Sequence, residues 1–145
     1  MELIKDSEVG TVEVVNDRTG TFSSLLEDSD FRVISSKGDL EEVANEIEST
    51  LPDLVVICVG VTGKYGILLC RELKKRRSTR MIPVVFLAKD SRLVEDKSAF
   101  IYGCIDYVKD DETDLVGKVS SYIKLGKVEK SLKRLRDRYD TCQNI

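Results

Sequence analysis

The middle of the chain contains two apolar runs without a charged residue. The first, LVVICV at 54–59, precedes a loop with Gly60, Gly63 and Gly66, and the second is PVVFLA at 83–88. Short runs rich in β-branched residues and bounded by turn residues are typical of strands that are covered on both faces. We therefore predict two central strands of a parallel sheet at these positions.

Weaker patterns on either side predict the remaining elements. Further short strands are predicted at 11–15, 31–35 and 104–108. Apolar residues at helical spacing predict amphipathic helices at 18–28, 38–49, 65–77 and 92–102, and another helix that starts near 113. The basic residues at 74–77 are interpreted as a solvated helix end.

Strands that alternate with helices predict an α/β fold, a doubly wound parallel sheet with helices on both faces. With 145 residues the chain is long enough for one domain with a full core, which we place at 1–124, and a helical extension at 125–145. Open α/β sheets bind ligands at the carboxyl ends of their strands, so the loop at 58–66 is the first candidate site.

Composition narrows the function classes. The chain has no histidine, which removes the commonest general base and metal ligand, and we expect no enzymatic activity. Its net charge of −3 argues against a nucleic-acid partner, and no apolar run reaches the ~20 residues that cross a membrane. The four cysteines are scattered, as expected for reduced thiols in a cytoplasmic protein.

Three stretches in order carry a resemblance to a known family: 51–66, which begins LPDL, 82–87 with IPVVFL, and 102–108 with YGCIDYV. Over residues 11–124 the chain resembles the receiver (CheY-like) domain of response regulators, which accepts phosphate from a histidine kinase in two-component signal transduction. The resemblance implies a flavodoxin-like five-stranded parallel sheet with strand order 2-1-3-4-5. A long helix that leaves such a domain implies a link to an output module.

The family's phosphorelay chemistry implies a set of residues at the strand ends. An aspartate after the third strand accepts phosphate, and an acidic pair after the first strand binds Mg²⁺. Carried over, the acceptor position is Cys58 and the acidic pair is Asn16 and Asp17. Cys58 has no carboxylate to phosphorylate. Asp17 alone is not expected to hold Mg²⁺, so no metal or other cofactor is predicted.

The remaining two positions also depart from the family. The hydroxyl position after the fourth strand is Ala88, and the lysine position after the fifth strand falls on Asp110. Lys109 lies one residue before this lysine position. In a strand an offset of one residue turns the side chain to the opposite face, unless a bulge restores its direction. We interpret the chain as a pseudo-receiver, a degenerate domain that is not phosphorylated at the usual site and acts through protein–protein contact.

Two alternatives remain open. The chain could be a phosphoacceptor that uses a different acid, such as Asp17 or Asp90. It could also be a thiol-based sensor at Cys58, although neighbouring acids would favour the neutral thiol there.

The end of the chain carries a second pattern. Apolar residues step by 3, 4, 3, 4 and 3 positions, as in a heptad repeat. We call these positions the tail seam: Leu125, Val128, Leu132, Leu135, Tyr139 and Cys142. The seam predicts a homodimer through a short coiled coil or contact with a protein partner, a kinase or an output domain; alternatively the helix folds this stripe onto its own domain. Gly126 costs roughly 1 kcal/mol relative to alanine and predicts a soft junction.

Overall fold

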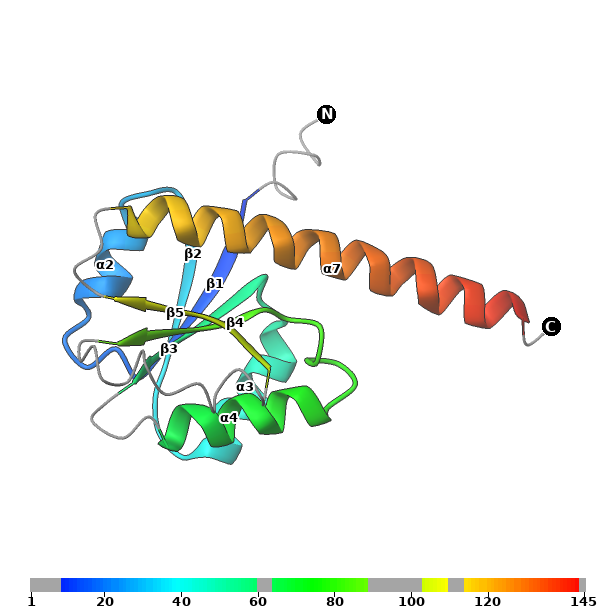
Figure 1. Ribbon diagram of the computed structural model, residues 1–145, viewed down its shortest axis with the longest axis horizontal. Helices are drawn as coiled ribbons and strands as arrows, with labels where there is room; N and C mark the ends of the chain where they lie inside the picture. Colours follow the sequence, from blue (N-terminus) through cyan, green and yellow to red (C-terminus); the bar gives the residue numbers. More distant parts are fainter. Residues whose placement is uncertain (1–8, 60–63, 89–102, 110–113, 144–145) are drawn as a thin grey trace.

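The computed structural model describes residues 9–59, 64–88, 103–109 and 114–143. They form a five-stranded parallel sheet of order β2-β1-β3-β4-β5, as predicted (Figure 1). The strands are β1 (Thr11–Val15), β2 (Arg32–Ser36), β3 (Leu54–Val59), β4 (Val84–Ala88) and β5 (Cys104–Lys109). The helices are α2 (Thr21–Glu27), α3 (Leu40–Thr50), α4 (Lys64–Lys75) and α7 (Leu115–Gln143). The helix predicted at 92–102 lies outside the described residues.

The sheet lies between two layers of helices, α3 and α4 on one face and α2 and α7 on the other (Figure 1). Alternate residues of β3 enter opposite cores because strand side chains alternate between faces. Val55 and Ile57 pack under α3 and α4, whereas Leu54 and Val56 pack under α2 and α7. The uncharged run predicted as a doubly covered strand is therefore confirmed.

Gly66 lies inside α4 and sets how closely this helix approaches the sheet. A Cβ atom at this position would lie 3.0 Å from both Phe86 Cζ and Val59 Cγ1. Its small size therefore serves helix–sheet packing, which corrects the prediction that Gly66 lies in a loop. Gly60 and Gly63 lie outside the described residues.

The basic end of α4 is only partly solvated. Lys74 donates from Nζ to the carbonyl oxygens of Arg80 (3.0 Å) and Ile82 (2.6 Å), and burial lowers the pKa of its ammonium group. Arg76 pairs with Glu48 at 3.0 Å and with Glu72 at 2.9 Å. The interpretation of 74–77 as a solvated helix end is therefore wrong for these two residues. Lys74 fastens the turn before β4, and Arg76 ties α4 to α3.

Helix α7 is 29 residues long and continues through Gly126 without a break. A Cβ atom on Gly126 would lie 1.7 Å from the carbonyl oxygen of Asp53, just before β3. The glycine therefore allows the helix to cross close to the backbone of the domain, and the predicted soft junction is wrong. The boundary predicted after residue 124 falls inside α7. Figure 1 shows the helix extending beyond the amino ends of the strands.

No helix among the described residues is long and apolar enough to cross a membrane.

Candidate functional site

The predicted pocket positions follow the carboxyl edge of the sheet. Val15 pairs with Ile57, Val59 pairs with Ala88, and Ala88 pairs with Lys109 across adjacent strands. Because parallel strands end at the same edge, the carboxyl ends of β1, β3, β4 and β5 lie side by side there. This is the arrangement that the sequence predicts for the candidate site.

Cys58 and Ala88 lie near the carboxyl ends of the adjacent strands β3 and β4, but they pack in different cores. Cys58 is level with Leu87, is partly buried and packs against the core under α2 and α7. Ala88 is fully buried in the core under α3 and α4. Cys58 is not part of a disulfide. These two positions present a thiol and a methyl group, and neither group is a carboxylate or a hydroxyl.

A register shift places Lys109 beside the end of β4. Val84 pairs with Cys104, but its neighbour Val85 pairs with Asp106, so that Ile105 is an extra residue on β5. Beyond this bulge the backbone of Lys109, and not that of Val108, is level with Ala88. A bulge is thus present on β5, although nothing in the sequence demanded one. Asp110 lies outside the described residues.

Asn16 and Asp17 form the turn that leads from β1 to α2. Asn16 has a φ of 61°, in the left-handed region that asparagine tolerates better than most residues. Oδ2 of Asp17 accepts a hydrogen bond of 2.8 Å from the backbone N–H of Ser23, in the first turn of α2. The carboxylate therefore caps a helix whose N-cap residue, Gly20, has no side chain to do so.

Asp17 has no acidic companions that would complete a metal site in the described part of the chain. Among these residues, no group of three or more histidine, cysteine, aspartate or glutamate side chains is placed to hold a metal ion.

Tyr65, which sequence reasoning missed, also lies at this edge. Its hydroxyl donates to the carbonyl oxygen of Gly38 at 2.9 Å and so joins the start of α4 to the β2–α3 loop. Burial, reinforced by the charge of Asp39, raises the pKa of the Tyr65 hydroxyl, while a hydrogen bond with Asn16 opposes this shift. The sequence signal for Tyr65 is its position as an aromatic residue between Gly63 and Gly66, in the loop predicted as the first candidate site.

The tail seam is exposed. Side chains at Leu125, Val128, Leu132, Leu135 and Tyr139 are between 39% and 64% exposed, and that of Cys142 lies outside the described residues. The prediction that the helix folds this stripe onto its own domain is therefore wrong for the five described positions. The domain instead packs against a different face of α7, which carries Leu115, Val119, Ile123 and Gly126.

A buried carboxylate anchors α7 at the amino end of the sheet. The side chain of Asp53 is 5% exposed and lies 2.9 Å from Lys130 Nζ and 3.6 Å from Lys127 Nζ. It also accepts a hydrogen bond of 2.9 Å from the backbone N–H of Thr11. Lys130 Nζ donates in addition to the carbonyl oxygen of Leu51 at 2.7 Å. We call Asp53, Lys127 and Lys130 the tail anchor; the sequence offered no spacing signal for it.

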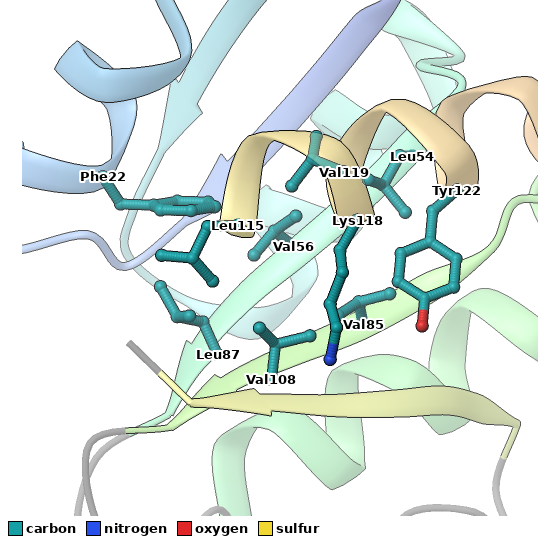
Figure 2. A pocket seen from close by; sticks show the side chains of 10 residues that line it. All are labelled: Phe22, Leu54, Val56, Val85, Leu87, Val108, Leu115, Lys118, Val119 and Tyr122. Atoms are coloured by element: carbon teal, nitrogen blue, oxygen red, sulfur yellow. The ribbon is translucent and has the colours of Figure 1, made fainter. Parts of the chain in front are cut away.

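A small hollow between α7 and the sheet belongs to the core. Figure 2 shows apolar side chains from α2, α7 and three strands around it, with the aliphatic stem of Lys118 and the ring of Tyr122. The Tyr122 hydroxyl donates to the carboxylate of Asp106 on β5. Apart from the Lys118 ammonium and the Tyr122 hydroxyl, the lining side chains are apolar, so we interpret the hollow as packing space.

The other two described cysteines are buried in the core under α3 and α4. Burial raises the pKa of Cys70 to about 11 and that of Cys104 to about 12. Both are therefore neutral thiols at physiological pH and poor nucleophiles.

Comparison with known proteins identifies the fold. No family model matches the chain. It is 30% identical over 95 residues to the phosphate regulon transcriptional regulatory protein PhoB of Rhizobium meliloti (strain 1021), and this match covers 64% of the chain and 41% of PhoB. The chain thus spans about two fifths of the length of this curated relative.

Solved structures of other proteins are also similar. The signal receiver domain of a signal transduction histidine kinase from Syntrophus aciditrophicus is 26% identical, with a TM-score of 0.62 over 83% of this chain and 91% of that domain. NtrX from Brucella abortus, in complex with ADP, is 20% identical with a TM-score of 0.72, over 91% of this chain and 30% of NtrX. The second likeness concerns the fold alone.

Proposed function

Since the chain is a receiver domain of the response-regulator (CheY-like) type, we propose that it transmits a signal through protein contacts without being phosphorylated at the usual position. One observation carries the proposal. At the end of β3, where the resemblance requires an acceptor carboxylate, Cys58 is partly buried against the core under α2 and α7. A thiol at this position cannot form the acyl phosphate of the family.

Two neighbouring positions support this proposal. Ala88, which replaces the hydroxyl, is fully buried and cannot donate a hydrogen bond to a phosphoryl oxygen. The one acid of the first-strand pair, Asp17, holds the N-terminus of α2 through Ser23. The strand ends at the carboxyl edge thus follow the receiver order, while these described side chains serve packing and capping. We expect no catalytic activity and no resident cofactor at this edge.

The partner in this proposal is a protein, a histidine kinase or an output module, that the domain contacts in the cytoplasm. The surface that we propose for the contact is the tail seam, because it is the exposed apolar stripe on the helix that leaves the domain. PhoB is a transcriptional regulatory protein, and the chain matches only part of it. We therefore assign any output chemistry to the partner or to an attached module.

A beryllofluoride titration tests the proposal. The full chain is mixed with beryllofluoride and Mg²⁺, and backbone amide shifts are followed by NMR, with a receiver domain that has an aspartate acceptor as the positive control. We expect the control to respond and this chain to show no saturable shift at the strand ends. A saturable change clustered after β1, β3 and β5 would refute the proposal.

The register of Lys109 favours a second candidate, a phosphoacceptor that uses a different acid. The bulge at Ile105 puts this lysine level with Ala88, at the edge where a phosphoryl group would bind. Asp17 would then be the acceptor, or Asp90, which lies outside the described residues. Fragmentation mass spectrometry after treatment with acetyl phosphate separates them, because the phosphoryl group stays on the acceptor, whereas Asp17→Asn would also remove a Mg²⁺ ligand.

A further inference from the structure

The tail seam is a narrow stripe that faces away from its own domain. Each residue turns an α-helix by about 100°. Leu132 and Leu135 therefore project on the side opposite to Ile123 and Gly126, which are buried against the domain. The seam occupies only two positions of each heptad, which is the pattern of a helix that packs against one other helix rather than against a broad apolar surface.

Cations border the seam on both sides. Lys124 and Arg138 each come just before a core position of the heptad and lie on one side, whereas Arg136 comes just after a core position and lies on the other. All three side chains are exposed. Glu129 is the one acid at such a bordering position in the described part of the seam. We call Lys124, Arg136 and Arg138 the positive border.

The domain adds to this charge on the side of Arg136. Arg136 approaches Met81 Sδ at 3.6 Å, in the turn before β4. Arg77 and Arg80 in the same turn are exposed, and residues 73–88 contain five cations and no acid. A partner on the seam would therefore meet positive charge from two segments that are distant in sequence.

Charge is divided unevenly between the tail and the rest of the chain. Residues 124–145 contain seven lysines and arginines and three acids, a net charge of +4. Since the whole chain carries −3, residues 1–123 carry −7. Two copies of this helix side by side would bring like charges together, and the acidic domain lies on the side of the helix opposite to the seam. The seam is therefore complementary to a partner with negative charge.

We infer that the tail seam binds an acidic amphipathic helix of another protein, one with an apolar stripe at heptad spacing and aspartate or glutamate beside it. This inference deepens the proposed function and rests on it, since it names the chemistry of the partner at the surface assigned there. The apolar side chains of the partner would cover the seam, and its acids would face the positive border. From Leu125 to Cys142 the seam is about 26 Å long, the length of a partner helix of roughly 18 residues.

The experiment measures the binding of two synthetic helical peptides to the full chain by fluorescence anisotropy. Both peptides carry the same leucine stripe at heptad spacing, but one has glutamate and the other lysine at the bordering positions. Each peptide repels its own copies, so that self-pairing does not compete with binding. At low salt we expect the glutamate peptide to bind about tenfold more tightly than the lysine peptide, and this preference should shrink as salt is added.

Two variants test the seam and its border separately. Leu135→Glu places a charge in the seam and should abolish binding of the glutamate peptide. Lys124→Glu, Arg136→Glu and Arg138→Glu in one chain reverse the positive border, so the preference should pass to the lysine peptide.

The matched control is a chain with Arg18→Glu, Arg32→Glu and Lys37→Glu. It undergoes the same change of net charge at exposed positions outside the tail, and it should prefer the glutamate peptide as the wild type does. Circular dichroism should report the same fold for all variants, because each replaced side chain is exposed.

Three results overturn the inference: equal binding of the two peptides, binding of neither, or binding of the glutamate peptide that survives Leu135→Glu. A wild-type chain that ignores the glutamate peptide but binds phosphatidylserine vesicles, or self-associates in sedimentation velocity, would identify a bilayer or a second copy as the occupant and would also overturn it. Each of these results leaves the beryllofluoride titration unaffected, so failure of this inference is distinguishable from failure of the proposed function.

Discussion

The two ends of the sheet differ in what their polar side chains do. At the carboxyl end, where the receiver resemblance places phosphoryl chemistry, the Asp17 carboxylate caps α2 and Ala88 fills the core. At the amino end, Asp53 is buried and paired with two lysines of α7. The difference indicates that the polar interactions of this chain fix the direction of its last helix. If so, changes at the amino end should cost more stability than changes at the carboxyl end.

The largest effect is expected for Gly126→Ala. The new Cβ would fall 1.7 Å from the Asp53 carbonyl oxygen, a backbone atom that cannot move aside cheaply. We expect a loss of about 2–4 kcal/mol in the free energy of unfolding, measured by urea denaturation. Gly117→Ala in the same helix is the matched control, because its new Cβ would meet only the flexible side chain of Asp114. Equal stability of the two variants would contradict the close crossing of α7.

The second-largest loss of stability is expected for Asp53→Asn. It removes the buried charge and leaves Lys127 and Lys130 without their carboxylate, while the amide oxygen can still accept from the N–H of Thr11. We expect a loss of about 1–3 kcal/mol in urea denaturation. Glu41→Gln, in the first turn of α3, is the control because Glu41 is exposed. If both variants lost the same small amount of free energy of unfolding, the prediction that the tail anchor stabilises the fold would be wrong.

Glu13 is a buried carboxyl in the middle of β1, between the two ends. Thr50 Oγ1 donates to its Oε1 at 2.7 Å, but its Oε2 and the Ser36 hydroxyl are buried without a hydrogen-bond partner among the described residues. Burial raises the pKa of the Glu13 carboxyl in the folded chain, an effect that the hydrogen bond from Thr50 partly opposes. The folded state therefore binds this proton more tightly than the unfolded state does.

Stability should consequently fall as the pH rises from the unfolded pKa of Glu13 through its folded pKa. Glu13→Gln removes this titration and supplies an amide that can donate to Ser36. We expect a gain of about 1–2 kcal/mol at pH 8 and a smaller gain at pH 4, measured by urea denaturation at both values. A difference between the variant and the wild type that did not change with pH would show that Glu13 keeps the same protonation state on folding.

The smallest effect is expected at the carboxyl end. Asp17→Ala removes the side chain that accepts from Ser23 N–H and should cost about 1 kcal/mol, as loss of a helix cap does. Asp17→Asn, which keeps an acceptor oxygen, should recover most of this loss. Addition of Mg²⁺ should leave the thermal midpoint of the wild type unchanged. A clear rise with Mg²⁺ that Asp17→Asn abolished would move Asp17 from a capping role to a metal-binding role.

The two central strands could be predicted from the sequence because each is an uncharged run with its own turn signals, and the strand order followed from the receiver resemblance. The seam was equally visible, since a heptad spacing needs no tertiary information. Whether the seam faces the domain or points away from it could not be predicted, because this depends on where Gly126 meets the backbone of Asp53.

The candidate site was predictable only in part. Position along the chain located Cys58 and Ala88 at the strand ends, but the bulge at Ile105 depends on pairing between β4 and β5. Likewise, a turn at Asn16 was evident from the sequence, whereas the capping bond from Asp17 required the path of the chain into α2. Contacts between residues distant in sequence set both features, and local patterns do not report them.

The central claim concerns the pocket, and intact mass spectrometry tests it most directly. The full chain is incubated with acetyl phosphate and Mg²⁺ beside a receiver domain that has an aspartate acceptor, and both are analysed before any acyl phosphate can hydrolyse. The account predicts a phosphorylated species for the control and an unchanged mass for this chain. A stable gain of one phosphoryl group, located by fragmentation at the carboxyl ends of the strands, would contradict it.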